Sequence, residues 1–460
     1  MIWTHKELQN IFKNIGPKVS DIKNVVIDSR LVQDHSLFIA LSGNNYDGHN
    51  FVRNAFLGGA GAAIVSRAIP EFEEQLIIVR DPYAALCQLA EAARARCQGK
   101  IIAVTGSVGK TTTKHILHSL LSAQAVTVSS AKSYNNYTGV PVSLAHLHQD
   151  TVYGVFEMGM NHANEITPLS KLVRPHVGLI TTIAPAHIEN LGSLEHIAQA
   201  KAEIFAGIEP NGIAILPRDV DQYELLVSEA KRYGVSQIIT FGHHEAADVR
   251  CLEYTSDAEG SSVEVRLFDV PLRYHLSLPG AHHISNSLAA LAAVYAVGGD
   301  IAQAVTGLST LAPVEGRGLY HRQPWRDGEI VLVDETYNAN PASVEAALKA
   351  LMLTPTQGRR IAILGDMREL GEYALEFHQN LAPTLHGSNI DLVCTCGVHM
   401  AELNKALPLS MRGPHVATSE QMVEKVNMII QPGDTVMIKG SRGMRMETIL
   451  HDLLKGAPQC

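Results

Sequence analysis

The chain lacks several features that would assign it to common classes. Its 460 residues include only six cysteines and no Cys-x-x-Cys pair, so we expect reduced cysteines, with Cys394 and Cys396 in the core rather than in a metal site. No apolar run approaches the roughly 18 residues of a membrane span. The first residues lack both halves of a signal peptide. A formal net charge of −9 argues against a nucleic-acid-binding surface. We therefore expect a cytoplasmic monomer with no membrane span and no nucleic-acid partner.

The most informative segment is a phosphate-binding loop, and it lacks a glycine of its own. An apolar run, Ile101–Val104, is followed by Thr-Gly-Ser-Val-Gly-Lys-Thr-Thr-Thr and then by a helical pattern. Small residues let backbone N–H groups approach phosphate oxygens, a lysine adds positive charge and a threonine hydroxyl can hold Mg²⁺. The glycine usual five residues before Gly-Lys is Val104 here, which disfavours GTPases and motors. We predict nucleotide binding by Gly106, Ser107, Val108, Gly109, Lys110, Thr111 and Thr112.

The order of strand-like and helix-like segments predicts an α/β protein of three domains. Residues 1–97 mix short strands and helices in a small N-terminal α/β domain. Its last helix is expected at residues 82–97, because a proline at the first helical position follows Asp81. Residues 98–313 alternate apolar strands with helices, which indicates a central parallel sheet covered on both faces and carrying the phosphate loop. Its last three strands alternate and are expected to be antiparallel. Beyond Gly316-Arg317-Gly318, residues 314–460 predict a Rossmann-like, doubly wound domain. Its five apolar strands are expected at residues 330–334, 360–364, 392–396, 416–418 and 435–439.

Four polar residues of the central domain have both functional and ordinary interpretations. Glu157 ends an apolar strand and could hold Mg²⁺ with Thr111, or it could be a helix N-cap or a surface acid. His187 follows another strand end, but a single histidine among 22 is more often an ordinary polar group. Lys201 lies in an amphipathic helix, where a solvated lysine is the simpler interpretation. Asn286 could contact an adenine edge or be a helix N-cap. His282-His283 is not expected to form a metal pair, because adjacent helical residues point apart.

Polar loops also follow strands in the outer domains. In the third domain they are Asp334–Pro341, Leu364–Arg368 and Lys439–Gly443, and three such loops at one sheet edge favour a ligand cleft. In the first domain they include Asp28-Ser29-Arg30 and Asp47-Gly48-His49, which turn formation alone could explain.

Together these motifs resemble the Mur ligases, the ATP-dependent amide-forming enzymes of peptidoglycan precursor synthesis. The resemblance runs in order over essentially the whole chain. Besides the motifs above, it includes Asn135–Pro141, Glu157-Met158-Gly159, Ala186-His187, Ala200–Glu203 and Tyr337–Pro341.

The resemblance implies roles for these positions. Lys110 would hold the ATP phosphates, Thr111 and Glu157 one Mg²⁺, and His187 and Lys201 a second, with Lys201 as its carbamate. The catalytic residues would then be Lys110, Glu157, His187 and Lys201, and the metal-binding residues Thr111, Glu157, His187 and Lys201. Asn286 would meet the adenine, and Arg317 and Asp334 would close over the nucleotide. Substrate-binding positions would be Asp28, Ser29, Arg30, Asp47 and His49 near the uridine, Asn135 and Asn136 at the sugar–peptide, and Asn338, Asn340, Asp366, Lys439, Ser441 and Arg442 at the dipeptide.

Within the family the pattern favours the members that add D-Ala-D-Ala to UDP-MurNAc-tripeptide through an acyl phosphate, because the Asp-Asn-Pro-Arg motif of the diaminopimelate-adding members is absent. The family usually has His-Asn where this chain has His282-His283, so Asn286 is the residue of this motif to which the family's role is assigned. A diaminopimelate- or lysine-adding ligase remains an alternative. Folylpolyglutamate synthetase is disfavoured by the uridine-type loops. A nucleotide-dependent switch protein would leave the polar third-domain loops unexplained.

Overall fold

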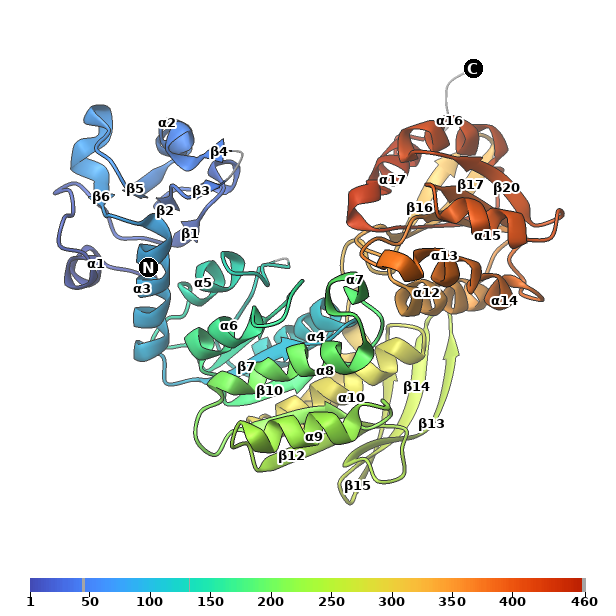
Figure 1. Cartoon of the computed structure of the whole chain (residues 1–460), viewed down its shortest axis with the longest axis horizontal. Coiled ribbons are helices and arrows are strands. Elements are labelled where there is room, and N and C mark those ends of the chain that lie inside the picture. The colour runs from blue at the N-terminus through green and yellow to red at the C-terminus, as the bar shows by residue number, and fades with distance from the viewer. Residues whose placement is uncertain (44–45, 132, 457–460) are drawn as a thin grey trace.

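The chain folds into three α/β domains, each built on its own sheet (Figure 1). The computed structural model describes residues 1–43, 46–131 and 133–456, so the last four residues of the predicted third domain lie outside the described part. The three main sheets are formed within residues 24–78, 100–276 and 319–439, inside the three predicted ranges, while the domain ends stay a prediction. No helix in the described part of the chain is long and apolar enough to cross a membrane.

The first domain has a four-stranded parallel sheet in the order β1-β2-β5-β6. Its elements are α1 (His5–Ile11), β1 (Asn24–Val26), β2 (Ser36–Ile39), α2 (Val52–Leu57), β5 (Ala60–Val65), β6 (Leu76–Ile78) and α3 (Pro82–Arg96), with a short β3 (Ser42–Gly43) and β4 (Tyr46–Asp47) pair. Asp81 caps α3 by accepting hydrogen bonds from Tyr83 N and Ala84 N. The expected helix at residues 82–97 is therefore confirmed within one residue.

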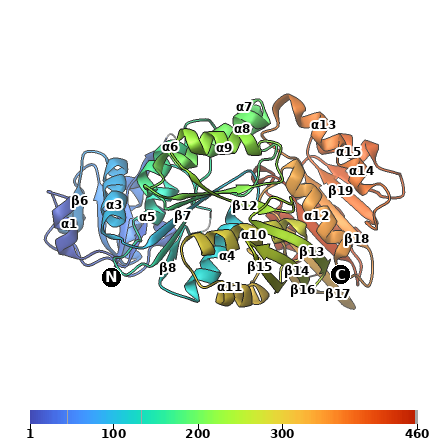
Figure 2. The same ribbon diagram turned by 90° about the horizontal axis from the view of Figure 1, so that it is seen from below.

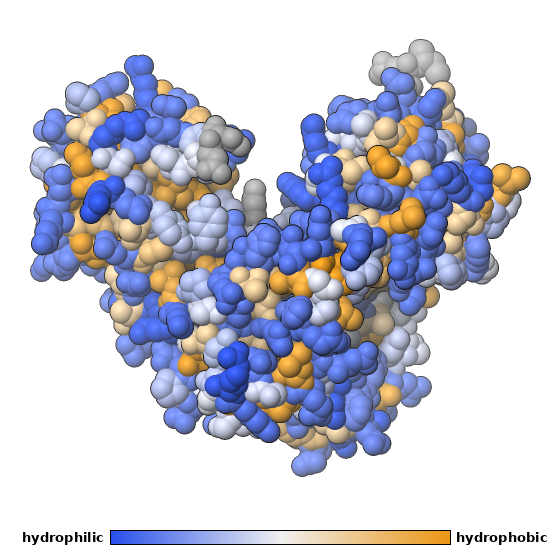
Figure 3. Space-filling view, viewed as in Figure 1, coloured by the Kyte–Doolittle hydropathy of each residue, from blue (hydrophilic) through white to orange (hydrophobic). Residues whose placement is uncertain are grey.

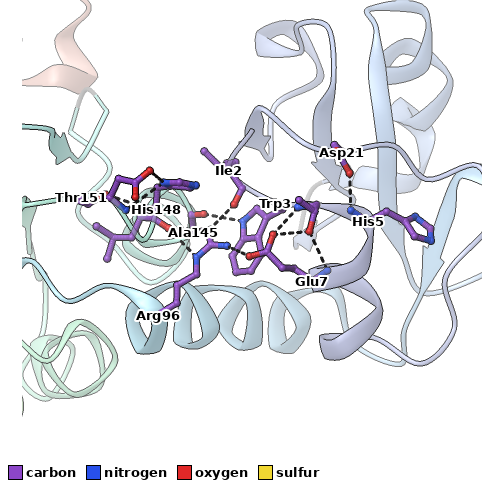
Figure 4. A network of polar contacts seen from close by, with 12 residues as sticks. Ile2, Trp3, His5, Glu7, Asp21, Arg96, Ala145, His148 and Thr151 are labelled. Carbon is purple, nitrogen blue, oxygen red and sulfur yellow. Dashed lines mark hydrogen bonds and ion pairs between the residues drawn. The ribbon is translucent and has the colours of Figure 1, made fainter.

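The N-terminal segment fastens the first domain to the central one (Figure 4). Trp3 is 2% exposed, and its Nε1 donates to the Ala145 carbonyl at 3.0 Å. The Arg96 guanidinium lies 3.7 Å from the centre of the Trp3 ring and donates to Glu7 and to the Ile2 and Leu147 carbonyls. These contacts join residues far apart in sequence, so the two domains form one packed unit.

The central domain has a nine-stranded sheet in the order β15-β14-β13-β12-β11-β10-β7-β9-β8. Strands β7 to β13 pair in parallel and the β13–β15 meander is antiparallel, as expected. The strands are β7 (Lys100–Thr105), β8 (Thr127–Ser129), β9 (Tyr153–Glu157), β10 (Val177–Ile180), β11 (Ile213–Pro217), β12 (Gln237–Gly242), β13 (Val249–Asp257), β14 (Gly260–Leu267) and β15 (Val270–Leu276).

Helices cover both faces of this sheet, with α8 and α9 on one side and α4 and α10 on the other (Figure 2). The helices are α4 (Lys110–Ser122), α5 (Gly139–Leu144), α6 (Ile166–Val173), α7 (Ile188–Leu191), α8 (Leu194–Ala202), α9 (Tyr223–Arg232), α10 (Ala281–Ala296) and α11 (Ile301–Gly307). The apolar run Ile101–Val104 of β7 is fully buried between these layers, as a strand covered on both faces requires.

The third domain has a six-stranded sheet in the order β16-β17-β21-β18-β19-β20. Its strands are β16 (Leu319–Trp325), β17 (Gly328–Glu335), β18 (Arg360–Gly365), β19 (Leu392–Cys396), β20 (Arg412–Val416) and β21 (Thr435–Lys439). Its helices are α12 (Pro341–Leu353), α13 (Ala374–Gln379), α14 (Ala382–Leu385), α15 (Met400–Ala406), α16 (Ser419–Ile429) and α17 (Glu447–Leu453). Cys394 and Cys396 are fully buried in β19, as core residues.

Two sequence expectations for this domain were wrong. The antiparallel edge strand β16 was missed, because it carries Arg322 and Pro324 and lacks a continuous apolar run. The strand expected at residues 416–418 ends at Val416 instead, because Thr418 caps α16 by accepting from Gln421 N.

Candidate active site between the central and third domains

Three neighbouring strands of the central sheet deliver the phosphate loop and its partners to one place. The loop follows β7, Glu157 ends β9 and residues 181–184 follow β10, and β7 lies between the other two. Carboxyl ends of parallel strands where the strand order reverses are the usual ligand site of such sheets. The loop is held there because Ser107 N donates to the Thr182 carbonyl at 2.9 Å and Thr181 Oγ1 donates to the Val108 carbonyl at 2.6 Å.

The loop itself is shaped by two glycines and closed by its lysine. Gly106 and Gly109 have φ of 145° and 87°, a region that glycine favours. Lys110 Nζ donates to the Gly106 carbonyl at 2.7 Å. Burial lowers the pKa of Lys110, opposed by the carboxylate of Glu157 and reinforced by Arg317. The lysine is thus a half-buried cation within the electrostatic reach of both residues.

Glu157 is a buried carboxylate at the centre of a polar cluster. It is 1% exposed and accepts from Thr111 Oγ1 and from Asn135 Nδ2, both at 2.8 Å. Lys114 Nζ lies 3.8 Å from its Oε2. The helix-cap interpretation of Glu157 is therefore wrong, because its oxygens face the phosphate loop.

The Thr111 hydroxyl and the Glu157 carboxylate are oxygen donors of the kind that Mg²⁺ prefers. Among the described residues no group of three or more His, Cys, Asp or Glu side chains is placed to hold a metal ion. A magnesium ion at these two residues would therefore take its other ligands from nucleotide oxygens and water, as is usual for this ion. The donor set fits Mg²⁺ on that basis.

Lys201 and His187 lie on the segments that follow β10. Lys201 is 2% exposed in α8, so its interpretation as a solvated helix lysine is wrong. Burial first, and then the charge of Lys110, lower its pKa well below the usual value, which favours a neutral amine. His187 precedes α7 with a φ of 61°, and its Nδ1 is in contact with Glu369 Oε2 of the third domain. That contact is the largest cause lowering the pKa of Glu369.

The linker, residues 311–318, brings an arginine to the phosphate loop. Arg317 Nη2 donates to Thr111 Oγ1 at 3.1 Å, and its guanidinium lies 4.3 Å from the centre of the Tyr337 ring. Asp334 is buried, and its carboxylate accepts from Gly316 N, Thr336 N and Thr336 Oγ1. Asp334 therefore holds the linker and does not line the cavity.

The three polar loops of the third domain leave adjacent parallel strands, β17, β21 and β18, so they share one sheet edge as predicted. Lys439 Nζ donates to Glu335 Oε2 and to the Asn338 carbonyl, both at 3.0 Å. Asn340 caps α12 by accepting from Ser343 N.

Three other predicted positions of this domain lie outside the cavity lining. Asp366 accepts from Met400 N at 2.7 Å, at the start of α15. Ser441 Oγ donates to the Ala339 carbonyl. The Arg442 guanidinium lies 5.5 Å from the centre of the Tyr337 ring.

The predicted positions of the first domain form a separate group. Asp28 accepts from Arg30 N and pairs with the exposed Arg30 guanidinium, while Ser29 begins a short helical turn. Asp47 accepts from His49 N and from Arg67 Nη2. Charges of Asp28 and Arg30 act on Tyr134 of the central domain, so these two residues face the central domain. Asn136 accepts from Gly139 N at the start of α5.

One cavity of about 550 Å³ joins the central domain, the linker and the third domain. The predicted positions that line it are Ser107, Val108, Gly109, Lys110, Thr111, Thr112, Asn135, Glu157, His187, Asn286, Arg317, Asn338, Asn340 and Lys439. Those that do not are Gly106, Lys201, Asp334, Asn136, Asp366, Ser441, Arg442 and the first-domain residues Asp28, Ser29, Arg30, Asp47 and His49. A wide hollow separates the first and third domains above the central one (Figure 3).

The cavity lining adds residues that sequence reasoning did not assign, among them His282, His283, Glu335, Tyr337 and Glu369. Glu335 and Tyr337 lie in a loop that had been recognised as polar, so its position after a strand was the available signal. Asn286 is the sixth residue of α10, so its N-cap interpretation is wrong. The rings of His282 and His283 pack with centroids 4.0 Å apart, so the argument that adjacent side chains point apart fails at this helix start.

Comparison with known proteins gives family matches along the chain. Residues 21–94 match the model "Mur ligase family, catalytic domain", residues 104–294 the Mur ligase middle domain, and residues 321–442 "Mur ligase, glutamate ligase domain". A curated relative from Rickettsia prowazekii, UDP-N-acetylmuramoyl-tripeptide–D-alanyl-D-alanine ligase, is 31% identical over 98% of this chain and 99% of its own.

Two solved structures agree with these matches. A crystal structure of MurF from Acinetobacter baumannii has a TM-score of 0.84 at 32% identity, covering 98% of this chain and 99% of that one. The MurF ligase from Thermotoga maritima in complex with ADP has a TM-score of 0.77 at 28% identity, covering 94% and 97%.

Proposed function

The chain belongs to the Mur ligase family, and we propose that it is the ATP-dependent ligase that joins D-alanyl-D-alanine to UDP-MurNAc-tripeptide in peptidoglycan precursor synthesis. The observation that carries this proposal is the shared cavity. It places a phosphate loop, a buried carboxylate and a linker arginine opposite a polar sheet edge of a second domain. A nucleotide held on one wall can there meet an acceptor held on the other.

The reaction follows from the chemistry of a carboxylate. The terminal carboxylate of the tripeptide attacks the γ-phosphorus of ATP, so that an O–P bond forms, the bond to ADP breaks and an acyl phosphate results. The free amine of D-Ala-D-Ala then attacks the acyl carbon, phosphate leaves with the carboxylate oxygen, and the amine loses a proton. Activation is needed because oxide cannot leave from a carboxylate, whereas phosphate can.

The residues of the cavity supply charge neutralisation and positioning. Two anions meet in the first step, and Lys110, Lys114 and Arg317 place three cationic side chains around Thr111 and Glu157. Mg²⁺ bound to Thr111 and Glu157 would neutralise phosphate charge there. Closure of the third domain over the cavity would exclude water, which would otherwise hydrolyse the acyl phosphate.

Substrate positions follow from the same arrangement. The nucleotide sugar would lie with its uridine near Asp28, Ser29, Arg30, Asp47 and His49 and its peptide toward Asn135, and the dipeptide would lie at the third-domain loops. The three units 1–97, 98–313 and 314–460 would then bind the UDP-sugar, ATP and the dipeptide. A cytoplasmic location fits this proposal, because ATP and a nucleotide sugar are its substrates.

An isotope experiment tests the reaction. UDP-MurNAc-tripeptide labelled with ¹⁸O in its terminal carboxylate should yield phosphate carrying one labelled oxygen, and only when ATP and D-Ala-D-Ala are both present. Lys110→Ala should abolish the release. Unlabelled phosphate at full rate, or full release with either substrate alone, would refute the ligase and favour a nucleotide-dependent switch.

Lys201 is proposed to act as a carbamate that binds a second Mg²⁺ with His187. A neutral amine attacks CO₂, and the burial that lowers the pKa of Lys201 keeps it neutral. The product is an anionic oxygen ligand.

With ¹³C-bicarbonate, a carbamate carbon signal should appear in the NMR spectrum of the protein and be absent in Lys201→Ala. Lys171, an exposed lysine of α6, provides the control, and Lys171→Ala should leave the signal unchanged. Lys201→Ala should be inactive and partly rescued by a short-chain carboxylate, and full activity would refute the role.

A further inference from the structure

Lys114 is a buried lysine that contacts the Glu157 carboxylate from outside the cavity lining. It lies in α4 one turn after Thr111, is 5% exposed and is not among the residues that line the cavity. Its Nζ lies 3.8 Å from Glu157 Oε2 and donates to the Ser130 carbonyl at 2.8 Å. Ser130 Oγ in turn accepts from the backbone N–H of Glu157 at 3.2 Å. Lys114 and Ser130 therefore hold Glu157 from two directions.

The protein charges around Glu157 do not balance. The carboxylate acts on both Lys110 and Lys114, the Arg317 guanidinium acts on both as well, and no other carboxylate of the described residues acts on either lysine. Burial lowers the pKa of Lys114, but the carboxylate 3.8 Å away opposes this shift and favours the ammonium. Three cations thus face one anion, which leaves an excess of two positive charges.

This excess of positive charge opposes a free divalent cation at Thr111 and Glu157. Like charges a few ångströms apart repel strongly where burial limits screening by water and salt. The polyphosphate of a nucleotide carries several negative charges and would reverse the balance. Lys110 and Arg317 line the cavity and can turn onto phosphate oxygens, whereas Lys114 stays beside the carboxylate. Lys114 is therefore the cation that opposes the metal in both states.

We propose that Lys114 is a positioning residue that makes Mg²⁺ binding at Thr111 and Glu157 depend on bound nucleotide. Its ammonium holds the carboxylate in place and offsets its charge, so the affinity for the cation is high only when a polyphosphate supplies further negative charge. The proposal rests on the proposed function, because it takes the phosphates of ATP to lie on the loop at residues 106–112. Metal and nucleotide then bind together, and free Mg²⁺ does not occupy the pair in advance.

Binding of Mn²⁺, a paramagnetic cation that takes the same oxygen ligands as Mg²⁺, tests the proposal on the full chain without turnover. The electron paramagnetic resonance signal of free Mn²⁺ gives its affinity with and without ADP. The wild-type protein should bind Mn²⁺ weakly alone and much more tightly with ADP. Lys114→Met removes the charge and keeps the length of the side chain, so without nucleotide it should bind Mn²⁺ roughly 10-fold or more tightly than the wild type. Lys114→Arg keeps the charge and should behave as the wild type.

The affinity for ADP, measured by calorimetric titration, provides a second readout. The factor by which Mn²⁺ raises the affinity for ADP equals the factor by which ADP raises the affinity for Mn²⁺. That factor should be smaller in Lys114→Met than in the wild type. A purely structural role for Lys114 predicts the opposite change in metal binding, because a displaced Glu157 would bind Mn²⁺ more weakly with and without ADP.

Lys231→Met is the matched control, because Lys231 is an exposed lysine of α9 outside the cavity lining. It should keep both wild-type affinities for Mn²⁺. Adding Glu157→Gln to Lys114→Met should remove the gained Mn²⁺ binding, which assigns that binding to this site. Thermal unfolding shows which variants fold, and Lys114→Gln, which is neutral and can still donate to Ser130, serves if Lys114→Met does not.

Two results would overturn the proposal. One is an affinity for Mn²⁺ without nucleotide that is unchanged or lower in the folded neutral variant, and the other is equal affinity of the wild type for Mn²⁺ with and without ADP. Failure of the ligase reaction is distinguishable from either result. The labelled-phosphate experiment follows that reaction, whereas the Mn²⁺ measurements contain neither the nucleotide sugar nor the dipeptide.

Discussion

Arg317 Nη2 donates to Thr111 Oγ1 at 3.1 Å, and this contact joins the linker of the third domain to the phosphate loop. The same Thr111 hydroxyl donates to Glu157 at 2.8 Å. A guanidinium thus stands beside the hydroxyl and the carboxylate that fit Mg²⁺. Its charge acts on both Lys110 and Lys114. Binding of Mg²⁺ and ATP at this place requires the Thr111 lone pair, so we expect the guanidinium to move onto a phosphate oxygen when they bind.

Arg317→Ala should therefore impair catalysis more than nucleotide binding. Preorganised positive charge at a transferring phosphoryl group typically contributes about 10²- to 10³-fold to kcat. Arg317→Lys should recover part of this loss, since it keeps the charge without the planar fork. Steady-state phosphate release at varied ATP gives kcat and KM. The control is Arg322→Ala, because Arg322 is an exposed arginine of β16 that pairs with Glu329 of β17. An unchanged kcat in Arg317→Ala would contradict the role.

Gly109 should not tolerate a side chain. It has a φ of 87°, and an added Cβ would collide with Asn286 Oδ1. Gly109→Ala should thus displace Asn286, distort the loop and abolish measurable ADP binding. Gly234 provides a matched control, because its φ is 83° and no atom lies within 4 Å of its added Cβ. Gly234→Ala should cost roughly 1–2 kcal/mol of stability from backbone strain and leave ADP binding intact. Equal ADP affinities in both variants would show that the collision has no effect.

A site could be predicted from the sequence where one continuous segment contains both the residues that determine its secondary structure and the residues that bind the ligand. The strand, loop and helix around Lys110 could be predicted because apolar run, small residues and helical pattern follow one another. Lys201 could not be placed by its pattern, because an amphipathic helix does not reveal which of its lysines the surrounding domain buries. Its functional prediction came from the family motif.

Contacts between domains could not be predicted from the sequence. Nothing near Glu369 indicates that it meets His187, because that contact depends on how the third domain sits. Asp334 lies in a recognised polar loop, but only the structure shows its oxygens engaged by Gly316 and Thr336.

Acidification should loosen the junction of the first and central domains through His146. Val25 N donates to His146 Nε2 at 3.1 Å, and His146 Nδ1 lies 2.8 Å from the Val142 carbonyl. Burial lowers the pKa of His146 below its usual 6.5, so the unfolded chain binds the proton more readily. The stability from the neutral ring is complete above about pH 6.5 and is lost as the pH falls through the folded pKa, by at most about 1.4 kcal/mol per pH unit.

His146→Gln should remove this dependence. Its melting temperature should fall less between pH 7 and pH 5 than that of the wild type, measured by thermal unfolding in matched buffers. Other histidines with lowered pKa values, such as His176 and His378, titrate in both proteins and cancel in the difference. Parallel curves for the two proteins would show that His146 does not titrate at this junction.

Trp3 should stabilise the same junction by packing more than by its hydrogen bond. The indole is buried, its Nε1 donates to the Ala145 carbonyl and Arg96 covers its face (Figure 4). Trp3→Ala leaves a cavity and an unpaired carbonyl, so it should lower the free energy of unfolding in urea by about 3–5 kcal/mol. Trp3→Phe keeps most of the ring and should cost about 1–3 kcal/mol, because the carbonyl remains unpaired. Neither change touches the cavity lining, so ADP affinity should stay at the wild-type value in the folded variants. A Trp3→Ala protein as stable as the wild type would mean that the first domain is held by its other contacts, among them His146 and Arg96.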